Sequence, residues 1–339
     1  TFLLSEKEEG KTGDELRTLI VTPASLVYNW KKEISQFVPE LSCKVITGNA
    51  AERQEMIQNG EDTDIWITSY DLLKRDIACY ENIRFANQVI DEAQYIKNHG
   101  TQAAKSARLI QSRFRMALTG TPMENRLSEL WSIFDFLMPG FLYGYQGFRE
   151  KFEEAIMNDR DEEVSARLRS MVHPFILRRL KRDVLTELPD KLEKTVTVEL
   201  EGEQRKLYDA YAKRLKMYLE KQSKEEFKQS KLEVLKELTR LRQLCCGPEL
   251  FLENYHGENA KMDACVELVR QAVDGGHKVL LFSQFTSVLD ELQKALAKEK
   301  IANHRIDGSV SKEQRIRLVD SFETVSYTHL RAHETDSYL

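Results

Sequence analysis

Val89-Ile90-Asp91-Glu92-Ala93-Gln94 is the stretch that decides the fold of this 339-residue chain, because an apolar run ends there in two adjacent acids. Side chains alternate across a strand, so both carboxylates can face one crevice only if the chain turns where the strand ends. Open parallel sheets bind their ligands at this carboxyl edge. The stretch therefore predicts a strand of a parallel sheet that ends at a site, with a solvated turn as the plainer alternative.

Asp91 and Glu92 suit one kind of chemistry at such an edge, which is Mg²⁺-dependent nucleotide hydrolysis. In that chemistry the first acid holds the metal through water, and the second polarises the attacking water. We therefore take Asp91 as a candidate metal-binding residue and both acids as candidate catalytic residues.

Short runs of β-type residues lie on both sides of this stretch and alternate with helical segments. Nearly apolar runs of a few residues suit strands that are buried on both faces of a parallel sheet. One intervening helix is amphipathic, with Leu26, Trp30, Ile34 and Phe37 at helical spacing. Residues 1–140 are therefore predicted to form an α/β lobe. Its strands are expected at residues 19–22, 43–47, 64–70, 87–90 and 115–118.

A hydroxyl-rich turn, Ala117-Leu-Thr-Gly-Thr-Pro122, follows another of these strands. Gly120 allows the backbone to bend, which places Thr119 and Thr121 at the same sheet edge as the two acids. Hydroxyls there could bond to the acids and report the nucleotide state. An ordinary turn is the alternative.

The segment from Leu19 to Trp30 is a third strand that runs into a turn and a helix. A helix start capped near Ser25, after Thr22 and Pro23, exposes N–H groups and hydroxyls that can hold a nucleic-acid phosphate. A plain capped helix explains the same residues.

The pattern changes after residue 140. Residues 141–175 are rich in aromatic side chains and are predicted to form loop and helix. Apolar and polar residues alternate over residues 191–200, which predicts a strand. Apolar residues at three- and four-residue steps over 202–244 predict a helical hairpin that is interrupted near 221–228. We assign 141–260 to a hinge and helical insertion.

The α/β alternation then resumes, which predicts a partial second lobe over 261–325. This lobe stops after two strands, and two parallel strands cannot cover themselves. Its strands are expected at 278–282 and 304–306, and its helices at 262–273, 287–298 and 312–322.

Residues 326–339 have neither the period nor the composition of a further strand, and they look like a translated adapter sequence that is foreign to the fold. His329 and His333 within them stand at metal-like spacing. They have no third ligand, so we predict no zinc site.

Composition excludes several classes of protein. The 55 acidic and 50 basic residues give 50 − 55 = −5, and 41% of residues are apolar. These values are typical of a soluble globular protein without a positive coat, although one basic groove remains compatible with them. We find no apolar run long enough to span a membrane and no signal peptide.

The five cysteines include no C-x-x-C pair, so their pattern indicates neither a disulfide framework nor a zinc ribbon. We expect a cytoplasmic protein, associated with the nucleoid in a bacterium or nuclear in a eukaryote.

Gly10-Lys11-Thr12 imitates the end of a phosphate-binding loop. The full loop needs a glycine five residues before Gly10, where this chain has Ser5, and no strand precedes the triplet. We therefore interpret residues 1–17 as the end of a helix followed by a solvated loop.

The order and spacing of nine segments closely resemble the SWI/SNF-type helicase-like ATPases of helicase superfamily two. The resemblance covers about residues 18–325. The segments are Thr22-Pro-Ala24, Ile67-Thr-Ser-Tyr70, Asp91-Glu-Ala-Gln94, Leu118-Thr-Gly-Thr-Pro-Met-Glu-Asn125, Pro174-Phe-Ile-Leu-Arg-Arg-Leu-Lys-Arg-Asp183, Glu187-Leu-Pro-Asp-Lys191, Leu241-Arg-Gln-Leu-Cys-Cys-Gly-Pro248, Val279-Leu-Leu-Phe-Ser-Gln-Phe285 and Ile306-Asp-Gly-Ser309.

The resemblance implies an α/β fold of tandem RecA-like parallel-sheet lobes, the second truncated, with a helical insertion between them. It also implies ATP and Mg²⁺ as cofactors, hydrolysis between the lobes, and double-stranded DNA as the partner, together with proteins bound to that DNA. Asp91 would hold Mg²⁺ and Glu92 would act on water. The coupling residues would be Gln94, Thr119, Gly120 and Thr121. The residues lining the DNA groove would be Thr22, Pro23, Ser25, Ser69, Ser283, Gln284, Gly308 and Ser309.

Arg178 and Arg179 fall in the family's hinge segment. A basic run there could bear on DNA phosphate or brace the lobes, and a solvated basic helix is the alternative.

The departures from the family pattern shape the functional expectation. The phosphate loop is expected before Thr1 and the arginine fingers after Phe322, and this chain has neither. We therefore expect a fragment of an ATP-dependent double-stranded DNA translocase or remodeller that is itself inactive. One alternative is a non-catalytic DNA- or protein-binding module of the same fold. Another is an RNA helicase of the same superfamily, which the Leu-Arg-Arg hinge and the Ser-Gln-Phe strand oppose.

Overall fold

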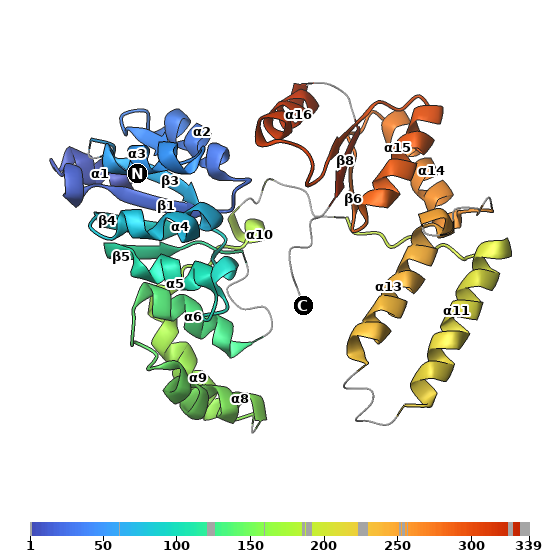
Figure 1. Cartoon of the computed structure of the whole chain (residues 1–339), viewed down its shortest axis with the longest axis horizontal. Coiled ribbons are helices and arrows are strands. Elements are labelled where there is room, and N and C mark those ends of the chain that lie inside the picture. The colour runs from blue at the N-terminus through green and yellow to red at the C-terminus, as the bar shows by residue number, and fades with distance from the viewer. Residues whose placement is uncertain are drawn as a thin grey trace. The chain divides into compact units, whose positions relative to one another are not determined.

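The computed structural model describes most of the chain as two compact units, Thr1–Leu188 and Pro189–Leu339 (Figure 1). The described residues are 2–332 without 61, 121–125, 159, 185–186, 188–191, 223–229, 251, 253–254, 256 and 325–327. In a few helical positions and at the C-terminal end only the backbone is described.

Unit 1 contains a five-stranded parallel sheet in the order β2-β3-β1-β4-β5. All five predicted strands are confirmed, and two of them begin earlier than expected because the extra residues of β4 and β5 pair with one another. The strands are β1 (Thr18–Thr22), β2 (Cys43–Val45), β3 (Ile65–Ser69), β4 (Arg84–Ile90) and β5 (Gln111–Ala117).

Helices connect these strands and continue beyond the sheet. The first is α1 (Phe2–Glu8), which confirms the helix expected at the N-terminal end. The others are η1 (Gly13–Glu15), α2 (Val27–Phe37), α3 (Ala50–Gln58), α4 (Tyr70–Asp76), η2 (Ile77–Tyr80), η3 (Ala93–Ile96), α5 (Gln102–Leu109), α6 (Leu127–Leu137), α7 (Tyr145–Phe148), η4 (Arg149–Glu153), α8 (Glu154–Asn158), α9 (Glu162–Val172), η5 (His173–Phe175) and α10 (Lys181–Val184).

The two faces of the sheet pack against separate cores, as side-chain alternation requires. In β1, Leu19 and Val21 join the core that contains Ile133 of α6, whereas Ile20 joins the core that contains Ile34 of α2. Every residue of β1 and β3 is buried. This two-sided burial is the reason that the strands read as apolar runs.

Trp66 is the centre of one of these cores, and its replacement tests the fold. The indole ring is 1% exposed and lies edge-on to Phe85 at a centroid distance of 5.5 Å. Trp66→Ala should lower the free energy of unfolding by about 3–5 kcal/mol, because it removes packing and leaves a cavity. Urea denaturation measures this loss. Leu192→Ala, at a side chain that is 93% exposed, is the control and should change stability by less than about 0.5 kcal/mol. Equal effects of the two changes would contradict this placement of the core.

Helix α2 differs from the sequence expectation at both ends. Its N-cap is Leu26 and no side chain caps it, so the predicted cap near Ser25 is wrong. The reason is a turn that closes first, in which the Leu26 N–H donates to the Pro23 carbonyl at 2.9 Å. At the other end Phe37 is 69% exposed and lies outside the core that its spacing predicted.

The strand expected over residues 191–200 is also absent from the part of this segment that the structure describes, 192–200. Leu192 is 93% and Val196 49% exposed. Alternation stabilises a strand only when one face is buried and a neighbouring strand takes up the backbone hydrogen bonds.

Unit 2 begins with the predicted helical hairpin. Helices α11 (Gly202–Glu220) and α13 (Lys231–Cys246) lie side by side and bury Leu215 and Val234 (Figure 1). The interruption expected near 221–228 falls largely on residues outside the described part of the chain. The hairpin is followed by η6 (Pro248–Leu250), α14 (Ala260–Asp274), β6 (Leu280–Ser283), α15 (Thr286–Lys298), β7 (Asn303–Ile306), α16 (Lys312–Thr324) and β8 (Thr328–Ala332).

The sheet of unit 2 corrects the expectation for the C-terminal residues. It has three parallel strands in the order β6-β8-β7, so Thr328–Ala332 forms the middle strand. The ladder is formed by backbone groups, which every residue here carries, so a segment of unsuitable composition can still fill the place between two strands. The expectation that residues 326–339 contribute no strand is wrong for these five, and 333–339 lie outside the described residues.

Candidate functional site

The carboxyl ends of three neighbouring strands bring the predicted acids and hydroxyls of unit 1 together. Thr22 and Ser69 are register partners at the ends of β1 and β3, and Val21 of β1 is the register partner of Ile90 in β4. Asp91 and Glu92 follow directly, and the Asp91 N–H donates to the Val21 carbonyl at 2.8 Å. Parallel strands thus place residues that are far apart in sequence at one edge.

Asp91 is held by three donors to its carboxylate. The Trp30 Nε1–H donates to Oδ2 at 2.8 Å and the Thr22 hydroxyl donates to the same oxygen at 3.3 Å. The Glu92 N–H donates to Oδ1 at 2.9 Å. Hydrogen bonds to an ionised carboxylate are among the stronger ones in proteins, so this side chain has a defined orientation.

Glu92 provides the sharp turn that the sequence required. Its φ is 51°, in the left-handed region that residues other than glycine seldom adopt. This turn redirects the chain from β4 into η3 so that both acids leave the strand at the same edge. Backbone strain of this kind, about 1–3 kcal/mol, is typical of functional sites.

Gln94 links Glu92 to the turn after β5. Its Nε2–H donates to Glu92 Oε2 at 2.6 Å, and its Oε1 accepts from the Thr119 hydroxyl at 3.1 Å. Thr119 therefore lies at the edge where the sequence placed it. Thr121 lies outside the described residues. Gly120 is exposed and its φ is not left-handed, and an added Cβ would meet no atom of the described residues within 4 Å, so none of the described residues makes the bend require glycine.

Tyr70 supports the backbone of the acids, a role that the sequence analysis missed. Its hydroxyl donates to the Asp91 carbonyl at 2.7 Å, and its ring stacks on Tyr95 at 5.0 Å. Burial, aided by the charges of Asp91 and Glu92, raises the pKa of Tyr70 well above its usual value. The phenol therefore remains a donor over the physiological range.

The remaining predicted residues of unit 1 lie outside this hydrogen-bonded cluster. Pro23 is buried and Ser25 is exposed. Ser69 is 2% exposed, and its hydroxyl accepts from the Leu72 N–H at 3.4 Å, which caps α4. Arg178 and Arg179 are exposed in a segment that is neither helix nor strand, so the alternative of a solvated basic helix is wrong for these two residues.

In unit 2, Ser283 ends β6 and Gln284 follows it, and both residues line a hollow of about 330 Å³. The Ser283 hydroxyl is bonded to the Phe285 carbonyl at 3.1 Å. Gln284 Oε1 accepts from an Arg242 Nη2–H, and Arg242 and Lys261 also line the hollow. Two cations therefore stand beside the predicted contact residues, and sequence analysis had identified neither.

The turn after β7 is organised by Asp307. The Ser309 hydroxyl donates to Asp307 Oδ1 at 2.6 Å and the Ser309 N–H donates to it at 2.9 Å, which holds the pKa of Asp307 below its usual range. Gly308 and Ser309 are exposed, whereas Asp307 is 7% exposed. Asp307 is thus the structural residue of a turn whose tip carries the predicted contacts.

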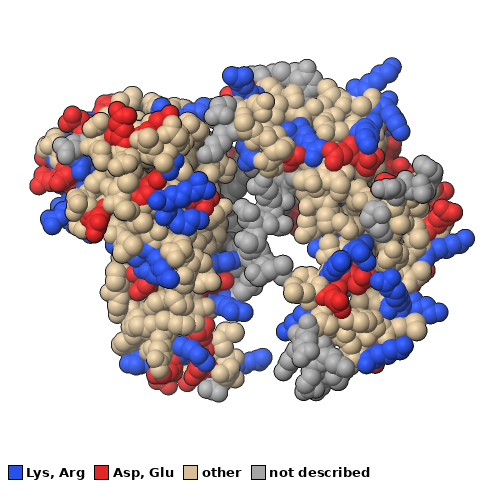
Figure 2. Space-filling view, in the orientation of Figure 1, with Lys and Arg blue, Asp and Glu red and all other residues tan. Residues whose placement is uncertain are grey.

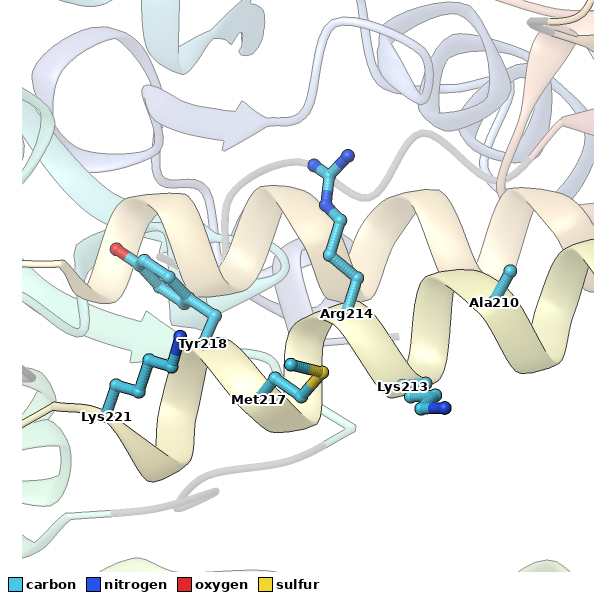
Figure 3. A pocket seen from close by; sticks show the side chains of 6 residues that line it. All are labelled: Ala210, Lys213, Arg214, Met217, Tyr218 and Lys221. Atoms are coloured by element: carbon cyan, nitrogen blue, oxygen red, sulfur yellow. The ribbon is translucent and has the colours of Figure 1, made fainter.

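A second hollow, larger than the one beside Ser283, is not part of either group of residues. It has a volume of about 520 Å³ and lies along α11 (Figure 3). Its described lining comes from one helix and its C-cap residue, namely Ala210, Lys213, Arg214, Met217, Tyr218 and Lys221. Size alone therefore does not identify the site.

Charge on the visible face is mixed, with Lys and Arg interspersed among Asp and Glu on both units (Figure 2). Lys11 of the phosphate-loop imitation pairs with Glu6 at 3.1 Å and with Glu9 at 3.2 Å, which supports its interpretation as a solvated loop. Within the described residues, no cluster of three metal-ligating side chains occurs and no helix has the length and apolar character to cross a membrane.

Comparison with known families identifies the fold. The SNF2-related domain matches residues 2–250. The chain belongs to this family. The helicase conserved C-terminal domain matches residues 260–332, a range that includes β8.

Relatives of this SNF2-related chain support the assignment. An uncharacterized ATP-dependent helicase of Mycoplasma genitalium is 36% identical over 91% of this chain and 29% of its own length. The ISWI chromatin-remodeling complex ATPase ISW1 of Saccharomyces cerevisiae is 31% identical over 90% of this chain and 28% of its own length. The chain therefore spans less than a third of these two relatives.

A solved structure confirms the RecA-like architecture. The SWI2/SNF2 ATPase core of Sulfolobus solfataricus in complex with double-stranded DNA is 31% identical to this chain, with a TM-score of 0.52. The match covers 97% of this chain and 69% of the Sulfolobus chain. The same core domain without DNA gives a TM-score of 0.50 at 30% identity.

Proposed function

We propose that this chain forms part of an ATP-dependent motor that moves along double-stranded DNA. The observation that carries the proposal is the hydrogen-bonded edge formed by Thr22, Asp91, Glu92, Gln94 and Thr119. Membership of the SNF2-related family and the likeness to a core bound to double-stranded DNA support it.

The donor set at this edge fits Mg²⁺. A carboxylate oxygen and nearby hydroxyls are the hard ligands that Mg²⁺ prefers, and this ion keeps several waters in place of a full protein cage. Asp91, fixed by Trp30 and Thr22, would hold the ion through water. The ion would neutralise charge on the phosphates of ATP.

Glu92 would orient and polarise the water that attacks the terminal phosphate. Its Oε2 is bonded to Gln94, which in turn accepts from Thr119. A shift of the turn after β5 would therefore change the position of the Glu92 carboxylate. This relay is a physical basis for coupling hydrolysis to DNA.

We expect residues 1–339 alone to have negligible ATPase activity. The phosphate-binding lysine and the arginine fingers each supply charge stabilisation worth orders of magnitude in rate, and this chain carries neither motif. Phosphate release, measured with and without duplex DNA, tests this expectation. DNA-stimulated turnover that Glu92→Gln abolishes would show that another residue of this chain grips the phosphates.

Duplex DNA binding separates this proposal from a protein-binding module. If Arg178 and Arg179 contact phosphates, replacing both by alanine should weaken binding about tenfold and lower the slope of log affinity against log salt by about 2. The control is the double change of the exposed Lys213 and Lys216, which removes the same charge from α11. Fluorescence anisotropy at several salt concentrations measures both. Equal losses from the two double variants would indicate non-specific attraction only.

A further inference from the structure

Trp30 stands apart from the other tryptophans in its hydrogen bonding. The chain has three tryptophans. The indole N–H of Trp66 donates to the Thr63 carbonyl and that of Trp131 donates to the Tyr143 carbonyl, each at 3.1 Å. The indole N–H of Trp30 donates instead to the Asp91 carboxylate at 2.8 Å. A tryptophan that is needed only for packing has no reason to donate to the candidate metal-binding acid.

The position of Trp30 in the chain adds a second observation. Thr22 ends β1 and Trp30 lies in the first turn of α2, so the two residues bracket the turn that contains Pro23 and Ser25. Both residues donate to the same oxygen, Asp91 Oδ2. The turn is therefore fastened to the acid at its entrance and at its exit.

We infer that Trp30 is a positioning residue that orients Asp91 for Mg²⁺ and ties the turn after β1 to that acid. This inference rests on the metal-binding role proposed for Asp91. Groups that hydrogen-bond to a metal-binding carboxylate commonly change metal affinity by 10–100-fold when they are removed. Trp30 packs against the core of α2 with its ring, so Trp30→Phe removes the donor and keeps most of the apolar contact.

Nuclear magnetic resonance of the whole chain tests the inference without ATPase activity. The indole N–H groups give three signals, which single Trp→Phe variants assign. Magnesium chloride titrated into the wild-type chain should shift the Trp30 indole signal and the Glu92 amide signal with one midpoint. The Trp66 and Trp131 signals should stay in place. A Trp30 signal that stays fixed while the Glu92 amide moves overturns the positioning role.

Variants then separate the positioning role from the function itself. The Glu92 amide donates to Asp91 Oδ1 and can report on the carboxylate when Trp30 is absent. We expect Trp30→Phe to raise the Mg²⁺ midpoint about tenfold and Trp131→Phe to leave it unchanged. An unchanged or lowered midpoint in Trp30→Phe overturns positioning. If Asp91→Asn still abolishes the response, the proposed metal role stands. If the wild-type amide does not respond at all, both inferences fail.

A second titration tests the link to the turn. A short duplex DNA, added at low salt, should shift the Trp30 indole signal in wild type and leave the Trp131 signal in place. A Trp30 signal that DNA binding does not move overturns the link between the turn and Asp91.

Discussion

Glu92→Gln should lower ATP turnover by about 10²–10⁴-fold in a longer form of this protein that also carries the phosphate-binding lysine and arginine fingers. ATP and duplex DNA binding should stay close to wild type, because the carboxylate acts only when water attacks. The Gln94 bond to Oε2 can persist, since the amide oxygen of glutamine also accepts. The loss should therefore fall on kcat.

Steady-state ATPase with and without duplex DNA measures this effect, and nucleotide binding is measured separately. Glu55→Gln makes the same chemical change at an exposed position of α3 and should retain wild-type rates. Wild-type turnover by Glu92→Gln would contradict the catalytic role of Glu92. It would not contradict the metal-binding role proposed for Asp91.

Asp91→Asn should reduce both Mg²⁺-ATP binding and turnover in the same longer form. The change removes a negative charge from beside the metal in the ground state, so binding suffers as well as rate. It also leaves the Trp30 and Thr22 donors facing a neutral amide. We expect a loss of at least about tenfold in Mg²⁺-ATP affinity, in line with removal of a charged partner.

Titration of Mg²⁺ at fixed ATP distinguishes this variant from Glu92→Gln. The Asp91→Asn protein should need more Mg²⁺ for half-maximal activity, whereas Glu92→Gln should not. Asp71→Asn, at an exposed carboxylate in the first turn of α4, is the matched control. If Asp91→Asn binds Mg²⁺-ATP like wild type, the metal role belongs to another group.

The clearest of the correct expectations for unit 1 concern β1 and β3, which are buried on both faces. Such strands are rich in apolar residues on both faces, and this property is local enough to be read from the chain. The acids after β4 were found for the same reason, because polar residues at the end of an apolar run mark the sheet edge. The errors at residues 191–200 and 328–332 concern strands whose existence depends on a neighbour. Hydrogen bonds between strands are made by the backbone, so the amino-acid sequence does not show which neighbour a strand will pair with.

The amino-acid sequence by itself determined the parallel sheet of unit 1, the helical hairpin of unit 2 and the edge that carries Asp91, Glu92 and Thr119. Only the tertiary structure decided which donors meet at that edge. Trp30 reads as a core residue of an amphipathic helix, yet its indole N–H reaches an acid 61 residues away in sequence. Periodicity specifies which face of a helix is buried, whereas a hydrogen bond depends on the position of a single atom. That position is fixed only when β1, β4 and α2 have packed together.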